Sequence, residues 1–323
     1  MKNFDNSEKK NNHSIHKNAV YDWWNSDKTK KWHKTKYDKE NLEYPHVVDR
    51  LNKALNYLTN LKPNKDNKVL EFGFGGGQSS EKILTLGYNY TGVEISKHMI
   101  QSAERKCDLF IKNNKAKFYH GSLDEKNKNL SYGEFDVVLI CGALQYTGDI
   151  DFALNEINKL MKEDGVFILC QANMFAIHEF FGFRKFLKST IRFFTGEKYF
   201  YSYSNSFKSI LLETKLSKYF RKYENSNFFK SNFMTKYEDE WSFKINKRLF
   251  SKTSLSKHLN LNGFKVIDKF GAPFLLYHDN KIINFIYRIL DSVLNFFYKF
   301  LKAGFLINLA DNIIFVSKKN VQK

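Results

Sequence analysis

Cysteine is scarce in this chain of 323 residues, which contains only Cys107, Cys141 and Cys170. Three scattered cysteines cannot build a disulfide framework, and their spacing fits no zinc-binding pattern. The first residues are polar and lack the apolar core of a signal peptide. We therefore expect a cytoplasmic protein without a structural metal.

Two common nucleotide-binding motifs are also missing. Residues 68–77 form a short apolar run that ends in clustered glycines, which predicts a buried strand turning tightly into a helix. The dinucleotide fingerprint G-x-G-x-x-G requires a further glycine at position 78 or 80, where this chain has Gln78 and Ser80. No Gly-Lys-Ser/Thr follows the turn, which excludes a P-loop. The turn therefore predicts a nucleotide-type site of another kind.

Acidic residues flank this turn. Glu71 stands two places before the first glycine, where a carboxylate suits a cationic group and repels a diphosphate. Glu94 lies at the end of the next expected strand, 90–95, and its two oxygens could each accept one hydroxyl of a cis-diol. The combination resembles the first motifs of the class I S-adenosylmethionine-dependent methyltransferases, through Glu71, Gly73, Gly75, Gly77 and Glu94.

The resemblance implies an α/β fold with a Rossmann-like sheet of seven strands, an antiparallel last strand, and S-adenosylmethionine as the cofactor. It implies cofactor contacts from four turns, at Glu71, Gly73, Gly75, Gly77, Glu94, Ile95, Ser122, Leu123, Cys141 and Gly142. The family often has an acid at the position of Ser122 for the adenine contact. Here the Ser122 hydroxyl or the Asp124 carboxylate must take that place.

The apolar periodicity between residues 68 and 170 alternates strand with helix, which predicts a parallel sheet with ligands at the carboxyl ends of its strands. We expect Ser96 to cap a helix and Gly165 to end another. The expected core elements are strands at 68–72, 90–95, 117–120, 135–140 and 166–170, helices at 78–86, 97 onward and 151–161, and a closing helix 253–261 with strands 263–270 and 312–317. The predicted organisation is a tail and helical lid (1–67), the cofactor-binding core (68–172), a basic aromatic insertion (173–250), the closing part of the core (251–273 and 311–319) and an amphipathic helical insertion (274–310).

The segment before the core is predicted to cover it. Residues 1–19 are polar and without periodicity, which predicts disorder. Trp23, Trp24 and Trp32 need an apolar surface, so the segment is either a lid over the cofactor pocket or a set of staples on the core. An amphipathic helix is expected over 44–61, with Val47, Val48, Leu51, Leu55 and Leu58 on its buried face.

Positive charge is concentrated outside the expected core. Residues 172–261 carry 17 Lys and Arg against 7 Asp and Glu, whereas 68–171 carry 12 against 14. This segregation indicates an anionic partner or surface. A compositional bias toward Lys and Asn is an alternative source of the total positive charge of the chain. The first insertion has a basic, aromatic-rich stretch with Arg184, Lys185, Lys188 and Arg192.

The second insertion predicts an amphipathic helix over about 281–306, with polar residues recurring every three or four positions. Its charges at Arg288, Asp291 and Lys299 stand too close together for a transmembrane span. We therefore expect it to pack on the protein itself, on a twin subunit or on a membrane surface. Peripheral attachment of the two insertions to an anionic membrane face is the hypothesis that combines these charges with this apolar face.

Methyl transfer from a sulfonium needs mainly alignment and a water-poor site, and a hydroxyl acceptor also needs a base. The candidate bases are His178, Tyr146 and His33. The turn 141–146 lacks the Pro-Pro pair typical of enzymes that methylate base amino groups. We therefore predict a methyltransferase with a small-molecule or lipid-like acceptor. The alternatives are an RNA-binding methyltransferase that uses the basic insertion, and a non-catalytic binding subunit, against which the intact acids and glycines argue.

Overall fold

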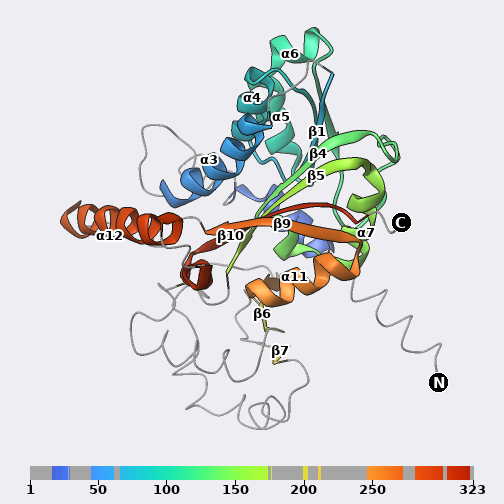
Figure 1. The fold of residues 1–323 in the computed structure, drawn as a ribbon. Coiled ribbons are helices and arrows are strands. Elements are labelled where there is room, and N and C mark those ends of the chain that lie inside the picture. Colours follow the sequence, from blue (N-terminus) through green and yellow to red (C-terminus); the bar gives the residue numbers. More distant parts are fainter. Residues whose placement is uncertain are drawn as a thin grey trace, which may run out of the picture.

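A seven-stranded sheet forms the centre of the molecule (Figure 1). The computed structural model describes residues 17–27, 29, 45–61, 66–173, 176, 199–202, 210–211, 246–271, 281–300 and 304–320. The strands of the sheet are β1 (Lys68–Phe72), β2 (Asn89–Glu94), β3 (Ala116–His120), β4 (Phe135–Cys141), β5 (Met161–Ala172), β9 (Phe264–Gly271) and β10 (Asn312–Lys319). Their order is β3-β2-β1-β4-β5-β10-β9, and β10 runs antiparallel to both of its neighbours. The predicted fold class is confirmed.

Helices cover both faces of this sheet (Figure 1). They are α3 (Pro45–Asn60), α4 (Gln78–Thr85), α5 (Lys97–Lys106), α6 (Asp108–Lys112), α7 (Ile150–Leu160), α11 (Lys252–Leu261) and α12 (Lys281–Phe300), with 3-10 helices η1 (Leu144–Tyr146) and η3 (Gly304–Leu309). One apolar core joins α7 and α11 to the sheet, and a second joins α3, α4 and α5 to it. Because both faces are covered, residues 137–140 of the central strand β4 form a continuous buried run, with Val138, Leu139 and Ile140 fully inaccessible.

Apolar spacing placed α3 correctly, and Leu51, Leu55 and Leu58 are buried as expected. The side chains of Val47 and Val48 lie outside the described part of the structure. Residues 17–25 are helical, so the predicted disorder of 17–19 is wrong; residues 1–16 lie outside the described ranges.

Two expectations about helix ends need correction. Helix α7 ends at Leu160, and Gly165 lies inside β5 instead of ending the helix. The register of β4 with β5 is irregular here, and a side chain at Gly165 would come within 3.0 Å of the Lys162 carbonyl oxygen. Gly165 is therefore accommodated where β5 is irregular and leaves no room for a side chain. Ser96 occupies the N-cap position of α5, but its hydroxyl makes no cap hydrogen bond and donates to the Trp24 carbonyl at 2.8 Å.

The two insertions are described in part. The first contributes a small antiparallel sheet of β6 (Tyr199–Ser202), β7 (Ile210–Leu211) and β8 (Asn246–Leu249), in the order β7-β6-β8. Its predicted basic helix lies outside the described residues, apart from Ala176. The second insertion contains α12, which begins at Lys281 as expected but ends at Phe300, before the predicted end near residue 306, and the 3-10 helix η3 lies at 304–309. In the portion of the chain that the structure describes, no helix combines the length and apolarity that crossing a membrane requires.

Gly77 and Gly87 both have positive φ, at 87° and 98°, but their surroundings differ. A Cβ at Gly77 would lie 2.7 Å from the Ala103 Cα, whereas one at Gly87 would meet nothing within 4 Å. We expect Gly87→Ala to lower the free energy of unfolding by about 1–2 kcal/mol through backbone strain alone. Gly77→Ala should cost about 1–3 kcal/mol more, because α4 must move away from α5. Urea denaturation of both variants measures the difference, and equal losses would show that α4 does not need this close approach.

Candidate active site

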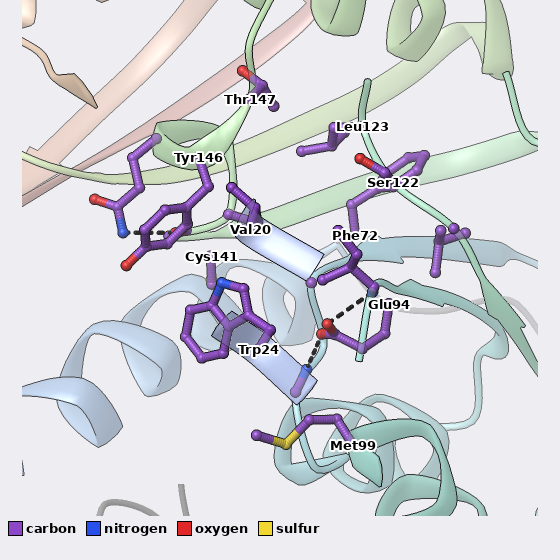
Figure 2. A pocket seen from close by; sticks show the side chains of 18 of the residues that line it. Val20, Trp24, Phe72, Glu94, Met99, Ser122, Leu123, Cys141, Tyr146 and Thr147 are labelled. Atoms are coloured by element: carbon purple, nitrogen blue, oxygen red, sulfur yellow. Dashed lines mark hydrogen bonds between the residues drawn. The ribbon is translucent and has the colours of Figure 1, made fainter. Parts of the chain in front are cut away.

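A cavity opens where the parallel strands β1, β2 and β4 end (Figure 2). Many of the side chains that line it are apolar or aromatic, and they come from the segment before the core, the strand ends and the loops that follow them. Predicted site residues that line it are Gly73, Gly75, Glu94, Ile95, Ser122, Leu123, Cys141, Gly142 and Tyr146. The structure therefore brings most of the predicted site together at the edge where the sheet topology placed it.

The glycine turn after β1 has left-handed backbone at Gly73, Gly75 and Gly77, with φ of 73°, 58° and 87°. A Cβ at Gly73 would lie 2.5 Å from the Cβ of Ala143, so only glycine lets this turn approach the loop after β4. Gly77 does not line the cavity, and its missing side chain serves the packing of α4 against α5. Its predicted contact with the cofactor is not supported by this position.

Glu94 is held by three backbone amides. Figure 2 draws its hydrogen bonds with other residues that line the cavity. Its Oε1 accepts from Ile95 at 2.9 Å and from Ser96 at 3.1 Å, and its Oε2 accepts from Gly75 at 2.9 Å. Burial raises the pKa of Glu94, and the three amide hydrogen bonds oppose that rise. One acceptor position remains on Oε2, because a carboxylate offers about four. The carboxylate can therefore hold one ribose hydroxyl as it stands, and capture of both requires the Gly75 amide to release Oε2.

Glu71 lies behind the glycine turn and does not line the cavity. Its side chain is 1% exposed, and the Tyr90 hydroxyl donates to its Oε2 at 2.8 Å. Burial raises the pKa of Glu71 to about 7, although hydrogen bonds from Ser79 and Tyr90 lower it in part. A carboxyl group that is half ionised near neutral pH thus lies beneath the turn. Its predicted contact with the methionine ammonium group stays a prediction.

Arg50 on α3 is a lining residue that the sequence analysis missed. Its Nη1 donates to Asn312 Oδ1 at 3.3 Å, and its Nη2 lies 3.2 Å from where a Cβ on Gly142 would be. Among the described residues around the cavity, it carries the cationic side chain that an anionic ligand group needs. A signal was present, because Arg50 precedes the buried Ala54 and Leu58 by four and eight residues and so shares their helix face.

A helix over residues 17–25 covers the cavity near Glu94 (Figure 2). Its Trp24 ring meets the Tyr146 ring edge-on, with centroids 5.6 Å apart and planes at 81°. Asn25 ties the helix to the end of β2, because its side chain accepts from the Lys97 amide at 2.9 Å and donates to the Ile95 carbonyl at 3.3 Å. Trp23 is buried beside Val20, so the segment combines the roles of lid and staple. Trp32 lies outside the described residues.

The loops after β3 and β4 are joined through Asp124, which also lines the cavity. Its Oδ1 accepts from the Gly148 amide at 2.8 Å, and its own amide donates to the Ser122 hydroxyl at 3.1 Å. Both candidates for the adenine contact are therefore at the cavity. A hydrogen bond to Cys170 and burial raise the pKa of the Cys141 thiol, which disfavours its thiolate form.

Of the candidate bases, Tyr146 lines the cavity, with its ring against Trp24. His178 and His33 lie outside the described residues, so their roles stay predictions. Tyr146 is thus the candidate base that the structure places at the site.

The buried Glu71 predicts a dependence of stability on pH. Its folded pKa of about 7 lies above its ordinary value of 4.5, so its stabilising contribution is complete below pH 4.5 and is lost as the pH rises through 7. We expect Glu71→Gln to remove a destabilisation on the order of 3 kcal/mol at pH 8 and to change little at pH 4.5. Thermal unfolding across this range measures it. Glu81→Gln, at an exposed position in α4, is the control, and an unchanged pH profile in Glu71→Gln would contradict the assignment.

Comparison with known proteins also identifies similarity to methyltransferases. Residues 70–167 match the model of a methyltransferase domain. Over 129 residues, 40% of this chain, the sequence is 31% identical to ubiquinone biosynthesis O-methyltransferase of Pelagibacter ubique, and the match spans 51% of that relative's length. Demethylmenaquinone methyltransferase of Tropheryma whipplei is 26% identical over 39% of this chain and 54% of its own length. Uncharacterized protein MJ1252 of Methanocaldococcus jannaschii is 27% identical over 78% of this chain and 75% of its own length.

Among solved structures, a chain in the complex between the Haloferax volcanii Trm112 methyltransferase activator and a methyltransferase has a similar fold. The TM-score is 0.51 at 12% identity, covering 91% of this chain and 96% of that chain. The domain match begins in β1 and ends in β5, so it contains the glycine turn, Glu94 and the loop after β4. Residues 70–167 therefore form a methyltransferase domain, and its sheet order, glycine turn and Glu94 are those expected of the class I S-adenosylmethionine-dependent methyltransferases.

Proposed function

We propose that this chain transfers the methyl group of S-adenosylmethionine to a small-molecule or lipid-like acceptor with an apolar ring. The aromatic pair at the cavity carries the proposal. Trp24 and Tyr146 meet beside Cys141 and offer ring surfaces to a flat apolar group. The relatives that are named for ubiquinone biosynthesis and for demethylmenaquinone support an acceptor of this class.

The residues at the cavity fit S-adenosylmethionine. Glu94 offers a fixed acceptor for a ribose hydroxyl, and Arg50 offers a cation for the carboxylate of the methionine part. Phe72 and Leu123 supply apolar surface for the adenine, with Asp124 and Ser122 beside them for its amino group. The open lining at Gly73 and Gly75 leaves the backbone accessible to the ligand.

S-adenosylmethionine supplies a methyl group on a sulfonium, which leaves without acid catalysis. The chain therefore has to align the acceptor and keep water out. Val20 and Trp24 on the covering helix, together with Tyr146 in contact with Trp24, supply apolar wall that excludes water. An acceptor hydroxyl must also lose its proton, and the Tyr146 phenol at the cavity can relay it by releasing its own proton to solvent as it accepts this one.

Incubation of the protein with methyl-labelled S-adenosylmethionine and a cell extract tests the proposal. The products are separated into lipid, polar metabolite and RNA fractions, and the Glu94→Gln variant serves as the control for enzyme-dependent label. We expect label in the lipid or small-molecule fraction, reduced in the variant. Label in RNA would replace the acceptor class with the RNA alternative, and no enzyme-dependent label in any fraction would contradict methyl transfer.

The fixed carboxylate at Glu94 predicts a loss of cofactor affinity on neutralisation. Glu94→Gln keeps the size of the side chain but removes the charge and places a donor or a weaker acceptor near the ribose. The affinity for S-adenosylmethionine should fall by about 1.5–3 kcal/mol, the range for hydrogen bonds to a charged group. Isothermal titration calorimetry on wild type and variant measures this loss. Unchanged affinity in a variant with a wild-type melting curve would assign the ribose contact to another residue.

A further inference from the structure

Helix α12 presents a broad apolar face to solvent. Eight of its large apolar side chains are between 41% and 71% exposed, namely Phe285, Ile286, Ile289, Leu290, Val293, Phe296, Phe297 and Phe300. At about 100° per residue these positions occupy about 140° of the helix circumference. None of the eight carries a hydrogen-bonding group that would fix the register of a protein partner. An apolar surface of this extent marks an interaction site.

Another face of α12 packs against the body of the protein. Leu294 and Tyr298 pack against Leu306 and Ala310, and the Tyr298 hydroxyl donates to the Lys269 carbonyl at 2.6 Å. Figure 1 shows the helix extending away from the sheet beyond this attachment. The described contacts of α12 with the body therefore leave its apolar face uncovered.

Basic positions follow one edge of this face in the sequence. Lys281, Arg288 and Lys299 are separated by steps of seven and eleven residues, which return to nearly the same line along an α-helix. The line falls next to Phe285 and Phe296 on the helical projection. Apolar residues bordered by Lys and Arg are the pattern of helices that lie in the headgroup region of a membrane.

We propose that α12 docks on the surface of an anionic lipid bilayer, with its Phe-rich face in the headgroup boundary. The net charge of +18 attracts the chain to anionic lipid. The same charge opposes pairing of α12 with a second copy of the chain, because two equally charged copies repel each other. Charge complementarity thus favours lipid as the occupant of this face.

The attachment of α12 lies at the edge of the sheet where the cavity opens. The chain continues from α12 through η3 into β10, whose first residue, Asn312, pairs with Ala172 at the carboxyl end of β5. Arg50 connects Asn312 to the cavity lining. Docking through α12 would bring this edge near the bilayer, where an apolar acceptor resides. This consequence rests on the proposed function, whereas lipid binding itself does not.

Co-sedimentation with vesicles tests the docking on the full chain. Vesicles of phosphatidylcholine alone are compared with vesicles that also contain phosphatidylglycerol, at low and high salt. We expect sedimentation with the anionic vesicles and its decrease with salt. In Phe285→Ser/Phe296→Ser/Phe300→Ser the partition coefficient should fall by about a hundredfold or more, because each phenylalanine contributes apolar burial. Lys281→Gln/Arg288→Gln/Lys299→Gln should lower it by roughly tenfold or more and weaken the salt dependence.

Leu109→Ser is the matched control, because Leu109 is 73% exposed on α6, away from α12. It should sediment like the wild type, and melting curves of all variants should agree with that of the wild type. Equal recovery of the wild-type chain in the supernatant with both kinds of vesicle would overturn the proposal, as would unchanged binding of the phenylalanine variant. A wild-type dimer in light scattering that this variant converts to a monomer, without vesicle binding, would assign the face to a second copy instead.

Discussion

Three backbone hydrogen bonds to the Glu94 carboxylate set the geometry on which the candidate site depends. They join the glycine turn after β1 to the end of β2 and to the start of α5, so strand ends that are far apart in the chain become one rigid rim. The covering helix is attached to this same junction, through Ser96 and Asn25. Because the carboxylate is buried and held, it would need no reorganisation to accept a ribose hydroxyl, which is the condition for a pre-organised site. Glu94 lines the cavity and keeps one hydrogen-bond acceptor position on Oε2 for a ligand.

Glu71, the other acid of the motif, destabilises the fold when it is ionised. Glu71 is enclosed behind the turn, where burial disfavours its ionised form and only Tyr90 and Ser79 compensate. A buried carboxyl group that ionises near neutrality destabilises the fold at the pH where a cationic ligand benefits from it. Ionisation of Glu71 therefore lowers the free energy of unfolding and places a negative potential beneath the glycine turn. Arg50, on the cavity side, gives the site the complementary charge for an anionic ligand group.

The sequence was informative wherever a local rule determined the structure. Continuous apolar runs predicted β4, the three- and four-residue spacing predicted α3, and clustered glycines predicted the positive φ values at Gly73 and Gly75. It failed where the outcome depended on contacts between distant segments. Arg50 reaches the cavity because α3 packs beside Asn312, 262 residues away, and Gly165 stays in β5 because of an irregular register with β4. Periodicity tells which face of an element is buried, but not which distant group that face meets.

We expect this cavity to take a nucleoside that carries a cationic and an anionic group, and not a pyrophosphate. Isothermal titration of the wild-type chain with S-adenosylmethionine and, separately, with NAD tests this claim most directly. The arrangement of Glu71, Glu94 and Arg50 predicts binding of S-adenosylmethionine and little or no affinity for NAD, because a carboxyl group beneath the turn repels a diphosphate. Preferential binding of NAD would contradict both the reading of the cavity and the role of its acids.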